Sequence, residues 1–594
     1  MATAKDTLET SGESSKGHRG EKTIQLKPAV HRRVLNFLND GVQPEDLVYE
    51  RRTATHDEGD PVHEDNPEEM KEKRKQILDF EIAKEIIDVR DREYPLGFRN
   101  FKELLNIAHI DIGRFDTFFH HFSEVFYGSW SVFPQNIPRR GTGGSDGVVH
   151  AALLNTGKVL FITADETTLL WDPENVTPAT FEDPVNQPHT MPGGYSQLCG
   201  HHVFLSDGKL LSVGGGGYGP NALARWGYKF DPASRTWTRT SNSMSEAKWY
   251  PTAVALGDQR VLVTCGNTGG HMDVYDEASD SFSQITSGDD RGFPNLYPGL
   301  HLLPNHAVLY SRTGWGSAGA GGSATPDSQS AYFTLSGATG SWNNITAALP
   351  NRAKGMSLML LSNTAPFVRI LVLGGVDNST NNTYEILDAS VLSSATSWSA
   401  PIAFPDGEHR SLCSAVLLPD GNVFVAGGIS RTNSPCTLFN PQSNSWSPMA
   451  ELPSIRDYHS VALLLPSGKV MMAGWNNTSI EIYSPPYLFG GARPVISSAP
   501  SLVHHGQSFV IESPDAASIV QVVLVRPMAV THQTDSEQKV LEMPYVHDHA
   551  NPTRLTLTAP HGGHPHSIAQ QGHYMMFAVN NNGVPSVAKW IYLH

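Results

Sequence analysis

Short apolar runs separated by tight turns repeat along the chain from Gly128 onward. Each unit has an apolar run, an Asp-Gly or Ser-Gly turn, a second apolar run that often ends in Gly-Gly, and an aromatic segment ending near Trp, as in HHVFLSDGKLLSVGGGG…YKFDPASRTWTRT and CSAVLLPDGNVFVAGGI…TLFNPQSNSWSPM. Apolar runs that flank a Gly-containing turn indicate a hairpin. A period of about 45–55 residues is typical of kelch-type blades, each a four-stranded sheet. The pattern predicts an all-β, seven-bladed kelch-type β-propeller over residues 128–489.

The last unit, Leu452 to Trp475, reads LPSIRDYHSVALLLPSGKVMMAGW and predicts two strands around a Pro-Ser-Gly-Lys turn. This blade is one strand short. GSWSVFP, Gly128 to Pro134, has the pattern of an outer strand. We expect it to complete the last blade, because closing the ring removes an exposed sheet edge.

The regions on either side of the repeats have a different pattern. Residues 490–594 contain alternating runs such as QSFVIESP, IVQVVLVRP and TRLTLTAP, which predict an Ig-like β-sandwich. Residues 1–27 are polar and predict a disordered tail. Residues 28–127 predict an α-helical extension of unknown role, because EEMKEKRKQILDFEIAKEIIDVRDREY has apolar residues at helical spacing. We expect His120 and His121 to lie on a packed helix face rather than in a metal site.

The formal net charge of −16 argues against a nucleic-acid-binding protein, which needs a clustered basic surface. No segment has the roughly 18 consecutive apolar residues of a membrane helix. The first residues lack the hydrophobic core of a signal peptide. The compartment is unknown from the sequence, which as written predicts a cytoplasmic protein and leaves export by an unrecognised route open. The four cysteines contain no CxxC pair and do not fix the redox compartment: Cys199, Cys265, Cys413 and Cys436.

Side chains with metal-binding or redox chemistry precede the first strands of different blades. Cys199 in GGYSQLCGHH and Tyr250 in MSEAKWYPTAVAL come before consecutive units, and Tyr458 and His459 come before the last. His532, in RPMAVTHQTDSEQKV, is placed near a hairpin tip of the C-terminal region. Each has a simpler interpretation alone, since a single Cys is often a small buried hydrophobe and a single His often binds a neighbouring loop.

Together, this order of residues resembles the galactose oxidase/glyoxal oxidase family of copper radical oxidases, over roughly Gly128 to the C-terminus. LLPSGKV and NNNGVPSVAKW also resemble that family. The resemblance implies one copper ion with Tyr250 as an equatorial ligand, His459 and His532 as imidazole ligands, and Tyr458 as axial ligand and general base. It also implies a self-generated radical cofactor, in which Tyr250 is joined through a thioether to Cys199. A fifth copper position would stay open for water or substrate.

These roles agree with the chemistry of the residue types. Copper(II) favours imidazole and oxygen ligands in a tetragonal arrangement. One copper carries one electron, whereas oxidation of an aldehyde or alcohol removes two, so a thioether-substituted tyrosine that forms a radical can carry the second. An unperturbed tyrosine has a pKa of about 10, so a tyrosine base at neutral pH needs a bound metal. The implied reaction oxidises a small aldehyde or primary alcohol with O₂ to the acid or aldehyde and H₂O₂.

The sequence departs from the family at several positions. Galactose oxidase stacks a Trp over its cross-link, but the corresponding loop CGNTGGHMDVYD contains none; His271 is nearby, and Trp315 is the other aromatic candidate. Galactose oxidase has an Arg where Pro298 stands, which favours the glyoxal oxidase branch and a small substrate. We expect His201 or His202 to donate a hydrogen bond beside the site. We expect exposed turns rather than a second metal site at His547, His549, His561, His564 and His566.

A second function class remains open at this stage. Many propellers only bind partners. The alternative is therefore a catalytically silent kelch propeller that binds protein or carbohydrate, with an unknown partner for the N-terminal region. The two hypotheses differ at Cys199, because a scaffold has no use for a Cys–Tyr cross-link.

Overall fold

The computed structural model divides into two compact units, Met1–Tyr127 and Gly128–His594. It describes these residues of the first unit: 38, 49–50, 77–78, 80–94, 98, 103, 107 and 123–127. It describes these residues of the second: 128–138, 147–177, 180–216, 222–266, 270–287, 296–315, 329–345, 352–375, 382–428, 436–474, 477–561 and 568–594.

The described part of the first unit contains helix α4, Phe80–Glu93, and the short strands β1, Tyr49–Glu50, and β2, Ile77–Leu78. Ile82, Ile86 and Val89 are buried and recur at helical spacing, which explains why this segment forms a helix. The helix predicted within EEMKEKRKQILDFEIAKEIIDVRDREY is confirmed over Phe80–Glu93, whereas Ile77–Leu78 of the same stretch form a strand. His120 and His121 lie outside the described residues.

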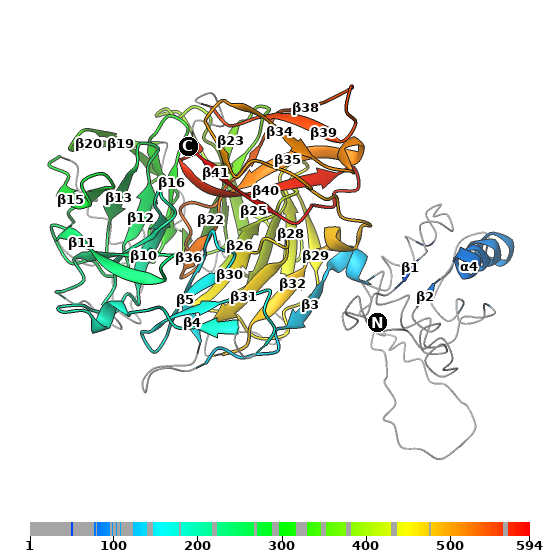
Figure 1. Ribbon diagram of the computed structural model, residues 1–594, viewed down its shortest axis with the longest axis horizontal. Helices are drawn as coiled ribbons and strands as arrows, with labels where there is room; N and C mark the ends of the chain where they lie inside the picture. Colours follow the sequence, from blue (N-terminus) through cyan, green and yellow to red (C-terminus); the bar gives the residue numbers. More distant parts are fainter. Residues whose placement is uncertain are drawn as a thin grey trace, which may run out of the picture. The chain divides into compact units, whose positions relative to one another are not determined.

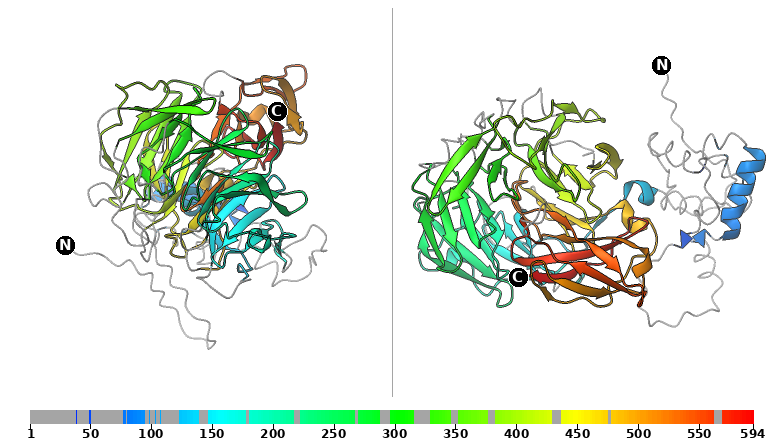
Figure 2. Two further views of the ribbon diagram at one scale, coloured as in Figure 1. Left: turned by 90° about the vertical axis from the view of Figure 1, so that its left-hand side faces the viewer. Right: turned by 90° about the horizontal axis from the view of Figure 1, so that it is seen from above.

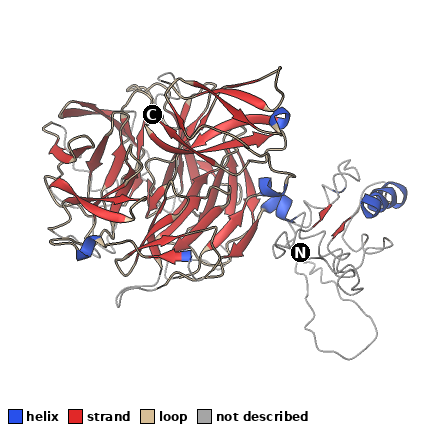
Figure 3. Cartoon of the chain, in the orientation of Figure 1, coloured by secondary structure: helices blue, strands red, loops and turns tan. Residues whose placement is uncertain are grey.

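The described part of the second unit consists mostly of strands (Figure 3), which confirms the predicted all-β class. Among the described residues between Ser129 and Ser484 there are seven antiparallel sheets of four or five strands, one of them extended by a strand from the C-terminal region (Figure 1). In chain order they contain β4 Val148–Leu153, β5 Val159–Thr163, β6 Thr168–Trp171 and β7 Phe181–Glu182; β8 Gly200–Phe204, β9 Leu210–Gly214, β10 Trp226–Asp231 and β11 Thr236–Ser243; β12 Thr252–Ala255, β13 Arg260–Thr264, β14 Asp273–Asp276 and β15 Ser281–Gln284; β16 Leu300–Leu302, β17 Val308–Tyr310, β19 Ala331–Ser336 and β20 Thr339–Asn344; β22 Met356–Leu361, β23 Val368–Leu373, β24 Thr383–Asp388 and β25 Ile402–Ala403; β26 Cys413–Leu417, β27 Val423–Gly427, β28 Cys436–Asn440 and β29 Ser445–Met449; and β30 Ser460–Leu464, β31 Val470–Gly474, β32 Glu481–Ser484 and β3 Ser129–Val132.

The last of these sheets closes as the sequence predicted. Strands β30 and β31 pair as an antiparallel hairpin, with Ser460 opposite Gly474. Strand β3 pairs with β32, so that Trp130 lies opposite Tyr483. The sheet is thus completed by residues more than three hundred positions earlier in the chain, which leaves no outer edge at β32.

The first strand of each sheet is the inner strand, and it is buried along its whole length in β4, β8, β12, β26 and β30. Neighbouring inner strands contact one another, as β30 does with β4 and with β26. Apolar side chains fill the space between sheets, and the rings of Phe424 and Tyr483 stack at 4.2 Å across one such junction. The residues that precede the inner strands are therefore held close together.

The C-terminal region forms two further sheets (Figure 2). One contains β33 Leu502–Val503, β35 Ile519–Val525, β37 Val540–Glu542, β40 Gly572–Asn580 and β41 Lys589–Leu593; the other contains β34 Ser508–Glu512, β38 Tyr545–His547 and β39 Arg554–Thr558. Strand β36, Ala529–Thr531, leaves this region and pairs with the inner strand β4, with Thr531 opposite His150. This pairing carries the next residue, His532, to the first inner strand.

Smaller elements of the second unit are the strands β18, Thr313–Gly314, and β21, Arg352–Ala353, and the 3-10 turns η3, Pro188–Thr190, η4, Pro486–Phe489, and η5, Ala516–Ser518. None of the helices in the described part of the chain combines the length and the hydrophobicity that crossing a membrane requires.

Candidate metal centre

The predicted site residues share an unusual backbone conformation. Cys199 and His459 directly precede an inner strand, Tyr250 lies two residues before one, and the three have φ angles of 65°, 67° and 63°. His532, just after β36, has a φ of 48°. Positive φ is uncommon for residues other than Gly, costs free energy and gathers at functional sites. We call residues with positive φ at the start of an inner strand strand-mouth residues; Tyr297, before β16, is another, with a φ of 47°.

The structure brings together three of the predicted side chains as a group of metal-binding donors. One ligand atom each from Cys199, His459 and His532 lie within 4.8 Å of one another, the only such group of three or more His, Cys, Asp or Glu side chains in the described chain. The two imidazole rings are 4.6 Å apart between centroids and nearly perpendicular, at 87°. His532, which the sequence places near a hairpin tip, is buried.

The two imidazoles each present a buried nitrogen to this group. Nε2 of His459 and Nε2 of His532 have no hydrogen-bond partner among the described residues. The other ring nitrogen of His532 lies 2.7 Å from the Thr531 hydroxyl, which fixes the ring orientation. Buried polar atoms are normally bonded, and a metal-binding His usually has its second nitrogen held in this way.

Both predicted tyrosines join the same group. The hydroxyls of Tyr250 and Tyr458 are hydrogen-bonded to each other. The ring of Tyr458 stacks on that of His459 at 3.6 Å, and the ring of Tyr250 lies 4.6 Å from that of His532. The site thus offers two phenol oxygens and two imidazole nitrogens, the nitrogen and oxygen set that copper(II) favours. These residues fit a single copper ion.

Burial controls the protonation of these groups. It lowers the pKa of His459 to about 3 and, together with His459 and His150, lowers the pKa of His532 well below its usual value. Both imidazoles are therefore neutral near pH 7, as metal binding requires. Burial, with added contributions from Cys199 and Tyr458, raises the pKa of Tyr250 far above its usual range. A phenolate can form there only when a nearby cation, such as a bound metal, compensates for burial.

The Cys199 thiol lies beside the Tyr250 ring. Burial raises the pKa of this thiol to about 12, and a hydrogen bond with the Tyr250 side chain opposes that rise. The backbones are also joined, because the Tyr250 N–H donates to the Cys199 carbonyl at 3.0 Å. Sulfur and phenol are thus neighbours held by two successive sheets.

Aromatic side chains enclose Tyr250. Trp249 stacks on one side at 4.3 Å and 25°, and Tyr297 stacks at 4.5 Å and 27°. Trp315 lies edge-on at 6.2 Å and packs against Tyr458 at 4.8 Å. Trp315 does reach the site, as the sequence suggested, whereas the ring of His271 bonds Gln284 instead, at 3.0 Å.

Sequence reasoning missed Trp249 and Tyr297 as members of the site, although Trp249 stands in the quoted segment MSEAKWYPTAVAL and Tyr297 directly precedes Pro298. Tyr297 is fully buried, and its hydroxyl donates to the Gly200 carbonyl at 2.8 Å. Adjacency of Trp249 to Tyr250 in sequence was the available signal. The stacking of Trp249 on Tyr250 depends on the positive φ of Tyr250, which the residue type does not predict.

Further histidines lie next to the metal-binding donors. His201 and His202 are buried on β8, and His150 is buried on β4. The Nδ1 of His201 accepts the Ala253 N–H at 3.3 Å, and the expectation that His201 or His202 donates a hydrogen bond beside the site stays a prediction. His150 was not predicted; its Nε2 accepts the Cys199 N–H at 3.0 Å. In the histidine-rich C-terminal segment, the described His547, His549 and His561 form no group of three ligands.

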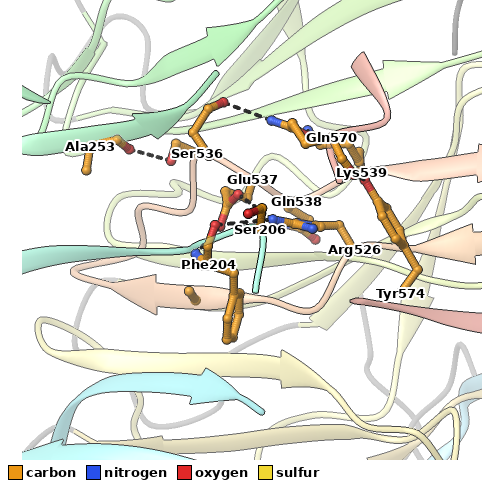
Figure 4. Close-up of polar contacts among 12 residues, drawn as sticks. Phe204, Ser206, Ala253, Arg526, Ser536, Glu537, Gln538, Lys539, Gln570 and Tyr574 are labelled. Atoms are coloured by element: carbon orange, nitrogen blue, oxygen red, sulfur yellow. Dashed lines mark hydrogen bonds and ion pairs between the residues drawn. The ribbon is translucent and has the colours of Figure 1, made fainter. Parts of the chain in front are cut away.

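Buried polar contacts hold the segment that carries His532 (Figure 4). Glu537 accepts the Phe204 N–H at 2.7 Å and pairs with Arg526 at 3.2 Å, and both charged side chains are 1% exposed. Ser536 donates to the Ala253 carbonyl at 2.6 Å. These bonds connect the segment after His532 to inner strands β8 and β12, and the pairing of β36 with β4 holds the segment before it. His532 is therefore held from both directions along the chain.

Comparison with known proteins agrees with this geometry. Residues 493–593 match the family model described as "Galactose oxidase-like, Early set domain". The chain is 29% identical over 456 residues to "Aldehyde oxidase GLOX" of Vitis pseudoreticulata, over 66% of this chain and 81% of that protein. It is 24% identical over 440 residues to "Galactose oxidase" of Gibberella zeae, over 67% of this chain and 61% of that protein.

A solved structure, "Novel fungal alcohol oxidase with catalytic diversity among the AA5 family, in complex with copper", is similar in fold, with a TM-score of 0.64 and 20% identity over 79% of this chain and 99% of that chain. The relatives and the donor set together define an O₂-dependent copper radical oxidase. Within that class, the chain is similar to members of the galactose oxidase/glyoxal oxidase family.

Proposed function

We propose that this protein oxidises a small aldehyde or primary alcohol with O₂, giving the acid or aldehyde and H₂O₂. The observation that carries the proposal is the convergence of Cys199, Tyr250, Tyr458, His459 and His532 from three inner-strand mouths and the β36 segment. Tyr250, Tyr458, His459 and His532 would hold one copper ion. The family relationship does not favour the alternative, a catalytically silent scaffold.

We propose further that Cys199 and Tyr250 form a thioether that serves as the radical cofactor. The contact between thiol and phenol supports this, as do the Trp249 and Tyr297 rings that flank Tyr250. A stacked aromatic environment spreads the electron deficiency of a tyrosyl radical and shields it from water. Trp249 and Tyr297 would thus serve the purpose of the Trp that the loop CGNTGGHMDVYD lacks.

The side chains divide the chemistry between them. Bound copper supplies one-electron redox chemistry and the positive charge that a buried phenolate needs. Tyr458 would accept the hydroxyl proton of an alcohol, or of the hydrate that an aldehyde forms with water, at its phenol oxygen, which already bonds Tyr250. The oxidised Tyr250 accepts the hydrogen atom from the substrate carbon. Two electrons and two protons leave the substrate, and O₂ takes them up as H₂O₂.

The absence of an Arg at Pro298 supports a small substrate. Pro298 has no side-chain donor, and its carbonyl accepts the Thr252 hydroxyl at 2.9 Å. A site without that guanidinium lacks a fork of donors for sugar hydroxyls. We therefore assign the chain to the glyoxal oxidase-like branch.

The finer architecture is part of the same proposal. The seven successive sheets support a seven-bladed kelch-type propeller over residues 128–489, and the two C-terminal sheets support an Ig-like β-sandwich over 490–594. Residues 28–127 are proposed as a separate region of unknown role behind a tail of residues 1–27.

The test is to load metal-free protein with copper under O₂ and measure its intact mass. Formation of the thioether removes two hydrogens, and a Cys199→Ser variant should keep its full mass. A peroxide-coupled assay over glyoxal, methylglyoxal, glycolaldehyde and galactose then identifies the substrate. Copper-loaded protein that retains a titratable Cys199 and makes no peroxide would contradict the proposal.

A further inference from the structure

Backbone hydrogen bonds join strand-mouth residues of successive sheets. The Tyr250 N–H donates to the Cys199 carbonyl at 3.0 Å, and the Tyr297 N–H donates to the Tyr250 carbonyl at 2.8 Å. Lys354 and Leu412, before β22 and β26, repeat the arrangement, with the Leu412 N–H bonded to the Lys354 carbonyl at 2.8 Å. All five residues have positive φ. At these junctions the carbonyl of the preceding mouth holds the next mouth in place.

The junction before Cys199 is different. The Cys199 N–H donates to the Nε2 of His150 at 3.0 Å, so a side chain replaces the backbone carbonyl as acceptor. His150 is the third residue of β4 and is 1% exposed. Cys199 is equally buried, at 1% exposure, so no water replaces this bond if it is lost.

His150 also adjoins the segment that carries a copper ligand. It lies opposite Thr531 in the pairing of β4 with β36. Its ring is 6.0 Å from that of His532 and nearly perpendicular to it, at 81°. One imidazole thus contacts both the backbone of the cross-linking cysteine and the strand that presents His532.

We infer that His150 is a positioning residue for maturation of the cofactor: its Nε2 holds the Cys199 backbone in the left-handed conformation that directs the thiol at Tyr250. The inference rests on the proposed function, because it concerns the thioether. In that step the S–H bond and one ring C–H bond break and a C–S bond forms. The two electrons and two protons pass to O₂, giving H₂O₂.

Because the acceptor at this junction is a side chain, a substitution can remove it, whereas the backbone carbonyls at the other junctions cannot be removed in this way. A His150→Phe variant keeps a ring of similar size but leaves the Cys199 N–H unpaired in a buried place. Cys199 can then relax toward negative φ, which turns its side chain away from Tyr250. A His150→Gln variant keeps a carbonyl oxygen that can accept the same N–H.

His202 provides a matched control. Its ring is 5.3 Å from that of His150, and it is buried to the same degree, at 1% exposure. It does not accept the Cys199 N–H. A His202→Phe variant therefore makes the same change of residue type, beside the same ring, without removing the bond.

The experiment measures the rate of cross-linking, by intact mass and by titration of free thiol, after copper and O₂ are added to metal-free protein. Circular dichroism and unfolding transitions show that each variant is folded. We expect His150→Phe to slow cross-linking by about 10- to 100-fold, the size of effect seen when groups that orient metal-site residues are removed. His150→Gln should recover most of the rate, and His202→Phe should match the unmodified protein.

The inference is overturned if folded His150→Phe cross-links at the unmodified rate. It is also overturned if His150→Gln and His202→Phe are slowed as much as His150→Phe, since the effect would then come from general packing. If the unmodified protein itself forms no cross-link, the proposed function fails instead. The unmodified protein thus separates the two failures.

Discussion

Glu537 connects the β36 segment to the inner strands, and its replacement by alanine tests whether this connection positions His532. The carboxylate accepts the Phe204 N–H at 2.7 Å and pairs with Arg526 at 3.2 Å, with both charged groups 1% exposed. In Glu537→Ala the guanidinium loses its charge partner and the Phe204 N–H loses its acceptor. Removing one partner of a buried ion pair costs about 3–5 kcal/mol, and we expect about 4 kcal/mol here. That is a large fraction of the 5–15 kcal/mol by which domains are typically stable.

Denaturant unfolding of the metal-free protein measures this loss, and titration with copper against a competing chelator measures the effect on the site. Because His532 is five residues before Glu537, we expect copper affinity to fall by about 10- to 100-fold. Glu537→Gln is the matched control: it keeps an acceptor for Phe204 but lacks the charge, so its loss of stability should be smaller. A Glu537→Ala variant that is destabilised by less than about 1 kcal/mol, or that binds copper with unchanged affinity, would refute the reasoning.

Three further predictions concern protonation, catalysis and substrate charge. Burial lowers the pKa of His202 to about 4 and that of His459 to about 3, so the stability that the neutral rings contribute is complete above about pH 6.5 and is lost as the pH falls toward those values. Between pH 7 and pH 5 each of these two histidines should lower the free energy of unfolding of the metal-free protein by about 2 kcal/mol, measured with denaturant. The stability of the His202→Phe variant should therefore depend less steeply on pH than that of the unmodified protein. Tyr458→Phe should retain bound copper but produce H₂O₂ about 10²- to 10⁴-fold more slowly, because it lacks the proton acceptor; a rate within threefold of the unmodified protein would exclude Tyr458 as the base. The Lys354 ammonium lies 5.4 Å from the ring centroid of Trp315, beside the site. The Lys354→Met variant should therefore lower kcat/KM about 10-fold for an aldehyde that carries a carboxylate and leave kcat/KM for a neutral aldehyde unchanged. An equal loss for both aldehydes would contradict the charge argument.

Much of the fold is predictable because its signals are local. Each hairpin such as β30–β31 is specified by two apolar runs and a Gly-containing turn, and GSWSVFP was identified as the closing strand from its pattern alone. The candidate site residues were singled out by their places before strands, and the resemblance to the copper radical oxidases implied that Cys199, Tyr250 and Tyr458 form one site.

The contacts that the sequence did not predict depend on backbone conformation. Trp249 stacks on its own neighbour, Tyr250, only because Tyr250 has a φ of 63°. His150 reaches Cys199 across a junction between sheets, at a sequence separation of 49 residues. Positive φ is usually signalled by Gly or Asn, and these positions hold Tyr and Cys. The backbone conformation at these positions comes from tertiary packing, which local residue preferences do not predict.

The strained mouths also explain why this architecture suits radical chemistry. A residue such as Tyr250 keeps a positive φ only if its surroundings prevent relaxation, and the bonds from Tyr250 to Cys199 and from Tyr297 to Tyr250 do this in sequence around the ring. Strand β3 closes that ring from outside and β36 enters it beside β4, so neither the sheets nor His532 can shift independently. A thiol, two phenols and two imidazoles are thereby fixed before any metal binds. Because folding has already oriented these side chains, they need little reorganisation when copper binds or when an electron is transferred. At one junction the acceptor is a side chain, His150, rather than a backbone carbonyl, so a substitution can remove it. The cross-linking rate of the His150 variants is therefore the most direct test of whether these junction bonds position the site.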